Sequence, residues 1–295
     1  MSERSHLIIT ADELQAMLGS PNLRVIDGSW YLPAQNRDAR AEFLEARIPG
    51  AVRFDIDGVS DRSSLLPHML PSPEAFAEAV GAMGISAENG IVVYDGPGLF
   101  SAARVWWTFT IMGAKSVRIL DGGFDRWKAE GRPVETGEPA LPAPAVFNAK
   151  PDLSRVRSIG DMRANLKSGN AQVFDARPFP RFCGTAPEPR PGLRSGHIPG
   201  SQPVPATDLI SDGKLKPLDE LREILDSVSL AMDRPAITTC GSGVTAAVIS
   251  LALESIGHPD HALYDGSWAE WGQADDAPLA QWLDGTLAGK TSVRE

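Results

Sequence analysis

A single cysteine opens a glycine-rich loop at the end of a short apolar run. The segment Cys240-Gly-Ser-Gly-Val-Thr245 directly follows Ala236-Ile-Thr-Thr239 and directly precedes a stretch of helical periodicity that begins at Ala246. The two glycines let the backbone curl, so that consecutive N–H groups converge on the cysteine side chain, and the positive end of the following helix dipole adds to them. Both effects favour a thiolate over a thiol, and the thiolate is the nucleophile. The loop therefore predicts a nucleophilic Cys240, and the same cradle would hold a sulfur atom or an oxyanion attached to it.

The alternative for Cys240 is a small buried hydrophobe at a strand end, which is the ordinary habit of a free cysteine. The combination of strand, cysteine, two glycines and helix start favours the activated residue. The other cysteine, Cys183, lies 57 residues away, which is not the paired spacing of a zinc or iron–sulfur site. His6, His258 and His261 have no metal-ligand spacing either. We therefore expect no metal, no cofactor, no disulfide framework and a reducing compartment.

The elements that must position this loop occur twice in the chain. The matching segments of the first copy are Ile91-Val-Val-Tyr-Asp95, Ser101-Ala-Ala103, Gly113, Asp121-Gly-Gly123 and Trp127, and those of the second are Ile237-Thr-Thr-Cys240, Thr245-Ala-Ala247, Gly257, Asp265-Gly-Ser267 and Trp271. From Ser101 onward the two copies keep a constant offset of 144 residues. Such internal repetition predicts two copies of one domain. Asp95 stands where the second copy has Cys240, so we expect the first copy to be non-catalytic.

Short apolar runs alternate with helical-period segments in each copy, which predicts a parallel sheet with helices on both faces. The fold class is therefore α/β, with two tandem doubly wound parallel-sheet domains, and a length of 295 residues suits two cores. Residues 132–152 hold five prolines and little periodic apolar content, which predicts an extended linker. We expect a first domain over 1–134, a linker over 135–152 and a catalytic domain over 153–295.

Charge and hydropathy exclude several classes of protein. The formal net charge is −10, with 28 Lys and Arg against 38 Asp and Glu, so a broad surface for nucleic acid or anionic lipid is not expected. No stretch approaches the roughly 18 apolar residues that a membrane span needs, and the first ten residues lack a signal or transit pattern. We expect a cytoplasmic protein in which any functional basic group acts locally.

These motifs resemble the tandem rhodanese-domain sulfurtransferases, specifically the mercaptopyruvate sulfurtransferases, along nearly the whole chain. The segments that carry the resemblance are Asp27-Gly-Ser-Trp-Tyr-Leu-Pro33, Asp55-Ile-Asp57, His68-Met-Leu-Pro71, Arg104-Val-Trp-Trp107, Asp121-Gly-Gly123, Gly184-Thr185, Glu188-Pro-Arg190, Gly196-His-Ile-Pro-Gly200, Tyr264-Asp-Gly-Ser-Trp268 and, most specifically, the Cys240 loop. The resemblance implies that 3-mercaptopyruvate is the sulfur donor. Thiosulfate-specific rhodaneses are similar but carry basic residues directly after the cysteine, where this chain has neutral Gly241 and Ser242.

The resemblance also implies roles for individual residues. Cys240 would take the sulfur as a persulfide, held by loop backbone N–H groups at Gly241, Gly243, Val244 and Thr245. Arg181 and Arg190 match the pair that grips the carboxylate and carbonyl of the substrate, and the alternative for them is a solvated surface. Ser242, His68 and Asp57 match a proton relay, which would place the active site in a cleft between the halves. The alternatives are a helix-capping Ser242 and a surface His68.

The implied sulfur acceptors are thioredoxin, small thiols or cyanide. Two other functions stay open: a thiosulfate:cyanide sulfurtransferase, and a non-enzymatic persulfide carrier or interaction scaffold. A cysteine phosphatase is disfavoured because its longer loop ends in an arginine that holds phosphate, and this loop has none. Four further residues have less specific readings. Cys183 is expected to be an unpaired thiol, with a resolving role toward Cys240 as a hypothesis; Trp30 and Phe100 are core residues by default but sit where they could line the cleft, and His197 is expected to be structural.

Overall fold

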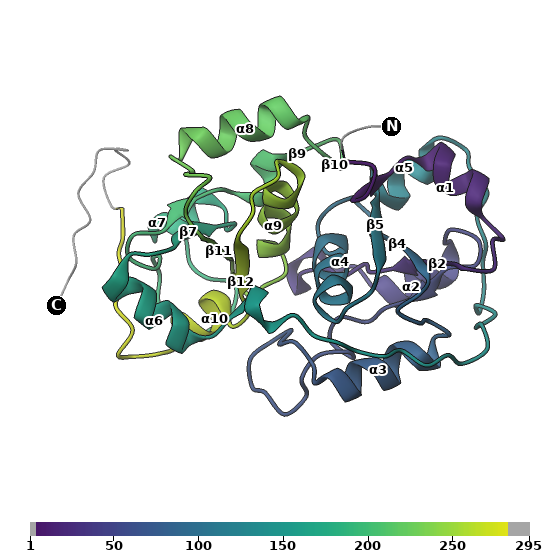
Figure 1. Cartoon of the computed structure of the whole chain (residues 1–295), viewed down its shortest axis with the longest axis horizontal. Coiled ribbons are helices and arrows are strands. Elements are labelled where there is room, and N and C mark those ends of the chain that lie inside the picture. The colour runs from purple at the N-terminus through teal and green to yellow at the C-terminus, as the bar shows by residue number, and fades with distance from the viewer. Residues whose placement is uncertain (1–3, 283–295) are drawn as a thin grey trace. The chain divides into compact units, whose positions relative to one another are not determined.

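The computed structural model describes residues 4–282, which divide into two compact units (Figure 1). The first unit contains residues 4–63, 70–153 and 210–215, and the second contains residues 64–69, 154–209 and 216–282. Each unit therefore includes one short segment from the opposite half of the chain. The predicted boundaries at 134 and 153 stay predictions.

The first unit is built on a five-stranded parallel sheet. Its strands are β1 (Ile8–Ile9), β2 (Leu23–Asp27), β3 (Val52–Arg53), β4 (Gly90–Tyr94) and β5 (Ser116–Leu120). The strand order is β1-β5-β4-β2-β3, so that β4, whose residues 91–94 are fully buried, lies in the centre. The carboxyl ends of β2 and β4 meet at Asp27 and Tyr94, which pair in register, and Asp95 follows directly.

The second unit repeats this arrangement, as the sequence predicts. Its strands are β6 (Val156–Arg157), β7 (Gln172–Asp175), β8 (Gln202–Pro203), β11 (Ala236–Thr239) and β12 (His261–Tyr264). The order β6-β12-β11-β7-β8 is that of the first sheet, strand for strand, and all pairs are parallel. Strand β11 takes the central place of β4, and Cys240 follows it as Asp95 follows β4.

Helices cover both faces of each sheet (Figure 1). The helices of the first half are α1 (Ala11–Met17), α2 (Ala39–Glu45), α3 (Pro73–Ala82), α4 (Ala102–Ile111) and α5 (Gly123–Ala129). Those of the second half are α6 (Ile159–Ser168), α7 (Phe179–Cys183), α8 (Leu218–Ser227), α9 (Ala246–Ser255) and α10 (Ser267–Trp271). Both domains thus have the predicted doubly wound α/β architecture.

The starts of α1 and α6 are fixed by the same device. Thr10 and Glu13 form a reciprocal capping box at α1, and Ser158 and Asp161 form one at α6. Each box satisfies two of the N–H groups that a helix start leaves unpaired. The helices that follow the two loops, α4 and α9, are buried on nearly every side, which explains their apolar composition.

The core of each domain packs helices against one apolar face of the sheet. In the first domain Leu14, Phe43, Phe124 and Trp127 pack on strand residues such as Val92. In the second, Met162, Trp268 and Trp271 pack on strand residues that include Ile237. Trp127 and Trp271, which are 144 residues apart, are both fully buried, and Trp106 and Trp107 of α4 are core residues.

The proline-rich segment runs in extended form along the first domain. Residues 138–152 form neither helix nor strand. The N–H groups of Ala145, Lys150 and Asp152 donate to carbonyl oxygens of Gly81, Met112 and Ile111, respectively. Phe147 is buried against Phe76 and Phe109, whose ring centroids lie 5.2 Å and 6.2 Å away. The segment therefore has no helix or strand of its own and is held by backbone hydrogen bonds and one aromatic anchor, and its role as a linker stays a prediction.

Candidate active site

The predicted strand–loop–helix context of Cys240 is present. Strand β11 ends at Thr239, and α9 begins at Ala246. Gly243 has a φ of +78°, a left-handed conformation that favours glycine and turns the loop back on itself. Cys240 is only 2% exposed and Ser242 6%, so the loop is folded into the domain and its polar groups are shielded from bulk water.

The start of α10 holds the nucleophile by its backbone. The N–H of Cys240 donates to Oγ of Ser267 at 3.2 Å, and the carbonyl oxygens of Cys240 and Gly241 accept from the N–H groups of Trp268 at 2.9 Å and Ala269 at 2.8 Å. These bonds fix the first two peptides of the loop on a second rigid element. The position of Cys240 is thus set by β11 and α10 together.

Ser267 is a site residue to which the sequence analysis assigns no role. Its φ is +50°, an uncommon value for a residue with a side chain. The counterpart in the first domain, 144 residues earlier, is Gly123 with a φ of +65°. Comparing the two copies could therefore have identified Ser267, because a serine stands where the other copy has glycine at a positive φ. The Ser267 hydroxyl oxygen accepts a hydrogen bond from the N–H of Cys240.

The first domain shows what its corresponding loop does with a negative group. Asp95 is fully buried, and its Oδ2 accepts from the N–H groups of Phe100 at 2.8 Å, Ser101 at 2.6 Å and Ala102 at 2.8 Å. Burial raises the pKa of Asp95, and the loop N–H groups act in the opposite direction. At the offset of 144 residues, the matching N–H groups of the second domain belong to residues 244–246. The loop N–H groups that form the cradle of the first domain are therefore occupied by that domain's own Asp95 carboxylate.

Arg181 lies at the end of a buried chain of ion pairs. Its guanidinium contacts Glu188 at 2.5 Å, Glu188 contacts Arg177 at 2.7 Å, and Arg177 contacts Asp175 at 2.7 Å. The side chains of Asp175, Arg177 and Glu188 are each 1% exposed, whereas that of Arg181 is 19% exposed. Arg177 also lies over the ring of Trp268 at 4.2 Å. The chain links the end of β7 to α10 and leaves Arg181 as its partly accessible terminus.

The guanidinium of Arg181 reaches the catalytic loop. A Cβ placed on Gly241 would lie 3.0 Å from Nη2 of Arg181, so a side chain at position 241 would crowd this group. Arg181 belongs to the short helix α7, where Pro180 fits because a helix's first turn leaves its N–H groups unpaired. Arg181 and the loop are therefore adjacent, as the predicted site requires.

Arg190 and His68 are brought together despite their separation of 122 residues. His68 belongs to the segment 64–69 that joins the second unit, is 4% exposed, and has its Nε2 3.3 Å from Nη2 of Arg190. Because a guanidinium only donates, Nε2 of His68 is the acceptor in this contact. His68 is therefore a buried partner of Arg190 and not a surface residue.

Asp57 lies in the first unit, where its Oδ2 accepts from Nε1 of Trp30 at 3.0 Å. The ring of Trp30 stacks with that of Phe100 at 6.2 Å, and both side chains are only partly buried. The relay of Ser242, His68 and Asp57 stays a prediction, as does the cleft in which it would operate.

The remaining singled-out side chains have separate surroundings. Cys183 and Cys240 are both free and buried, and burial raises the pKa of Cys183, which disfavours its thiolate at neutral pH. His197 stacks on Phe182 at 3.9 Å while its Nδ1 lies 2.9 Å from that residue's carbonyl oxygen, which supports a structural role. Among residues 4–282, no cluster of three or more His, Cys, Asp or Glu side chains is arranged to hold a metal ion.

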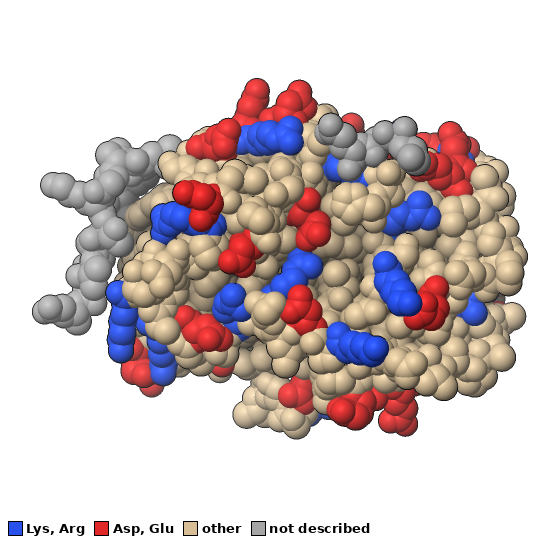
Figure 2. All heavy atoms as spheres, viewed as in Figure 1, with Lys and Arg blue, Asp and Glu red and all other residues tan. Residues whose placement is uncertain are grey.

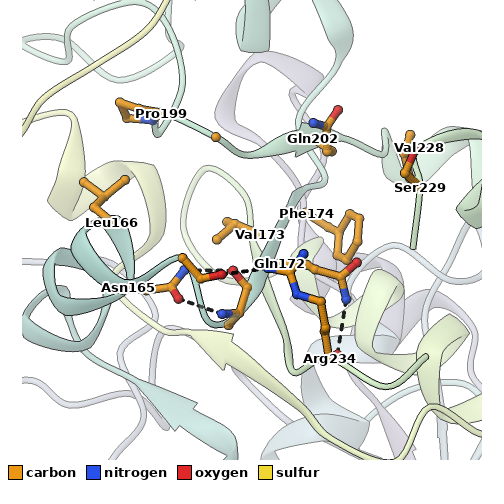
Figure 3. A pocket seen from close by; sticks show the side chains of 13 residues that line it. Asn165, Leu166, Gln172, Val173, Phe174, Pro199, Gln202, Val228, Ser229 and Arg234 are labelled. Carbon is orange, nitrogen blue, oxygen red and sulfur yellow. Dashed lines mark hydrogen bonds between the residues drawn. The ribbon is translucent and has the colours of Figure 1, made fainter. Parts of the chain in front are cut away.

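A hollow of about 360 Å³ in the second domain lies away from this chemistry (Figure 3). Its wall includes Gln172, the first residue of β7, so the hollow lies at the amino end of that strand. Cys240 follows the carboxyl end of the neighbouring parallel strand β11 and is therefore at the opposite edge of the sheet. Its lining contains no Cys, His, Asp or Glu, and the polar side chains of Asn165, Gln172 and Arg234 bond to backbone carbonyls. We assign it no part in catalysis.

Surface charge and helix length bear on the functions that the sequence disfavours. In the view of Figure 2, basic and acidic side chains are interspersed, and neither sign gathers into one broad patch. Along residues 4–282, none of the helices combines the length and apolar character that crossing a membrane requires.

Asp27 of the first domain provides a pH-dependent prediction. It occupies the place of Asp175 but faces Ser29, whose N–H donates at 2.8 Å, where Asp175 has Arg177. Burial raises its pKa to about 6 from the ordinary 3.8. Between these values the folded state keeps a proton that the unfolded chain releases, so the free energy of unfolding falls as pH rises through this window, by roughly 3 kcal/mol in total.

The variant Asp27→Asn lacks this titration. The free energy of unfolding of the variant should therefore rise relative to that of the wild type as pH increases from about 4 to 6. Above that window the difference between the two should stay constant. Urea unfolding at several pH values, followed by tryptophan fluorescence, measures the two curves. Parallel curves for variant and wild type would contradict the assigned cause.

Comparison with known proteins gives one consistent result. A model of the rhodanese-like domain matches residues 10–130 and again residues 158–274. Human 3-mercaptopyruvate sulfurtransferase is 45% identical over 264 residues, covering 88% of this chain and 89% of its own. The Escherichia coli K12 3-mercaptopyruvate sulfurtransferase is 43% identical over 272 residues, covering 92% and 96%. Bovine thiosulfate sulfurtransferase is 43% identical over 284 residues, covering 95% and 94%.

A solved structure agrees with these relatives. The crystal structure of SseA from Escherichia coli, described as a 3-mercaptopyruvate sulfotransferase with the rhodanese fold, superposes with a TM-score of 0.82 at 40% identity. The match covers 88% of this chain and 98% of that one.

Proposed function

Because the chain belongs to the rhodanese-like family, with two such domains in tandem, we propose that it transfers the sulfur of 3-mercaptopyruvate through a persulfide on Cys240. The thiolate of Cys240 attacks the sulfur of the donor, and the carbon–sulfur bond breaks. Pyruvate leaves as the enolate and takes up a proton. A second thiol or cyanide then attacks the outer sulfur, the sulfur–sulfur bond breaks, and the Cys240 thiolate is restored.

The observation that carries this proposal is the filled cradle of the first domain. In a cysteine persulfide the outer sulfur is the second atom beyond Cβ, as is a carboxylate oxygen of aspartate. Three loop N–H groups hold Oδ2 of Asp95 at that position. The loop after Cys240 has the same strand before it and the same helix after it, and it stabilises the negative outer sulfur in the same way.

Substrate recognition is assigned to Arg181 and Arg190. Both are donors fixed by partners, Arg181 by Glu188 and Arg190 by His68, so little side-chain entropy is lost when a carboxylate binds. Ser242, backed by His68 and Asp57, is assigned the proton that the donor thiol loses and the enolate gains.

Thiosulfate is the second candidate donor, because the bovine relative named for it is as similar overall as the relatives named for 3-mercaptopyruvate. Neutral Gly241 and Ser242 favour the singly charged keto acid, since no basic side chain stands directly after Cys240 in the loop to hold a dianion. Initial rates with both donors decide between them. A higher kcat/KM with thiosulfate would overturn the choice of donor and leave the persulfide in place.

The substitution Arg190→Ala tests the assigned grip on the carboxylate. Loss of a charge-assisted hydrogen bond should raise KM for 3-mercaptopyruvate about 10- to 100-fold, with a smaller effect on kcat. Steady-state kinetics with cyanide as acceptor measure both constants. Arg163→Ala is the matched control, because Arg163 forms a surface ion pair with Asp276 in the same domain. An unchanged KM in Arg190→Ala would contradict the assignment.

The acceptors and the location of the protein remain predictions of this proposal. Thioredoxin and small thiols are the acceptors expected for a cytoplasmic enzyme. Cyanide serves as the acceptor in an activity assay. Comparing turnover with reduced thioredoxin and with a small thiol at equal thiol concentration identifies the preferred acceptor.

A further inference from the structure

The acid that holds Arg181 is buried between two guanidinium groups. The side chain of Glu188 is 1% exposed; one of its carboxylate oxygens accepts from Arg177 at 2.7 Å and the other from Arg181 at 2.5 Å. Arg177 has Asp175 as its own counter-ion at 2.7 Å. The charge of Glu188 therefore offsets that of Arg181, the member of the chain that reaches the Cys240 loop.

A buried carboxylate is costly, so its presence at this position calls for a reason. A neutral hydrogen-bond acceptor would also orient the guanidinium. A carboxylate orients it and in addition removes one unit of positive charge from the surroundings of the Cys240 loop. The two effects can be separated by chemistry, because glutamine retains the shape of glutamate without its charge and aspartate retains the charge with a shorter side chain.

We propose that Glu188 is a positioning and specificity-determining residue, which fixes Arg181 beside the loop and lowers the positive charge next to Cys240, so that singly charged donors are favoured over dianions. Since the favoured donor is the 3-mercaptopyruvate proposed above, this assignment rests on the proposed function. A thiosulfate dianion carries one more negative charge than the keto acid. Within a few ångströms of a poorly solvated carboxylate, that extra charge corresponds to about a tenfold loss of affinity.

The variant Glu188→Gln should change the choice of donor. We expect the ratio of kcat/KM for thiosulfate to kcat/KM for 3-mercaptopyruvate to rise about tenfold, because the extra positive charge helps the dianion more than the monoanion. Glu188→Asp keeps the charge and withdraws the carboxylate. It should raise KM for both donors and leave the ratio unchanged.

Two further variants test charge independently of Glu188→Gln. Arg181→Gln leaves the carboxylate in excess and should lower the ratio. The double variant Arg181→Gln with Glu188→Gln is charge-balanced and should return the ratio to the wild-type value, while KM stays raised for both donors. These variants keep the test decisive if Glu188→Gln alone does not fold, which circular dichroism reports.

The first domain supplies the matched control. Arg37 and Glu42 form an ion pair at 2.7 Å, and a Cβ on Gly96, the residue after Asp95, would lie 3.3 Å from Nη2 of Arg37. Glu42→Gln thus breaks a similar pair beside the loop that lacks a cysteine, and it should leave the donor ratio unchanged.

A donor ratio that does not follow the charge of the pair would overturn the assignment of Glu188. The outcomes that do so are an unchanged or lowered ratio in Glu188→Gln, or a double variant that keeps the lowered ratio of Arg181→Gln. Failure of the proposed function has a different signature: the wild-type protein would take no sulfur from 3-mercaptopyruvate. The two failures are therefore distinguished before any variant is compared.

Discussion

Cys240→Ser should lose sulfur transfer almost completely, by about 10³-fold or more in kcat, while the fold is retained. A serine oxygen cannot accept sulfur to form a persulfide, and the covalent intermediate is the only route by which the donor's sulfur reaches the acceptor in this mechanism. Cys240 is held by backbone contacts to α10, which a serine keeps, so the circular dichroism spectrum should not change. Pyruvate release with cyanide present measures the activity.

Cys183→Ala is the control for this experiment. Cys183 is the other thiol of the chain and is also buried, but it lies at the end of helix α7 and not at the start of a glycine-rich loop. We expect most of the activity to survive. Retained transfer in Cys240→Ser, or its loss in Cys183→Ala alone, would contradict the assignment of the nucleophile.

Arg177→Met should lower the free energy of unfolding by about 3–5 kcal/mol, the effect of removing one partner from a buried network. Arg177 is 1% exposed and is the only cation of the ion-pair chain that contacts both Asp175 and Glu188. Methionine retains much of the side-chain volume over Trp268, so lost packing explains only a small part of the change. Urea unfolding at neutral pH measures the difference.

The control for Arg177→Met is Arg37→Met in the first domain. The side chains of Arg37 and Glu42 are 34% and 36% exposed, and such surface pairs contribute at most about 1 kcal/mol. Equal effects of the two substitutions would mean that the ion-pair chain of the second domain does not stabilise it through its buried charge.

The central strands and the helices after the loops could be predicted from sequence because their apolar patterns are long enough to read. Strand β11 coincides with the apolar run Ala236–Thr239, and helix α9 begins at the predicted Ala246. The edge strands β1, β3, β6 and β8 have two residues each, too few to carry a pattern, and they form because a neighbouring strand offers hydrogen bonds. The short helix α7 begins between prolines and resembles a loop in sequence.

The candidate site was predictable where the repeat and the loop motif determine it. Cys240, its cradle and the pairing of its domain with a copy that carries Asp95 all follow from the sequence. The contact of His68 with Arg190 does not, because it depends on six residues of the first half that pack in the second unit. Nor does the burial of Glu188, since an acid between two arginines in sequence is more often a solvated residue.

The most direct test of the central claim is the intact mass of the protein after incubation with 3-mercaptopyruvate and no acceptor. We predict one added sulfur atom per chain, located on Cys240 by peptide mapping, removed by cyanide, and absent from Cys240→Ser. Pyruvate release with no added sulfur on the chain, or added sulfur on Cys183 and not on Cys240, would contradict it.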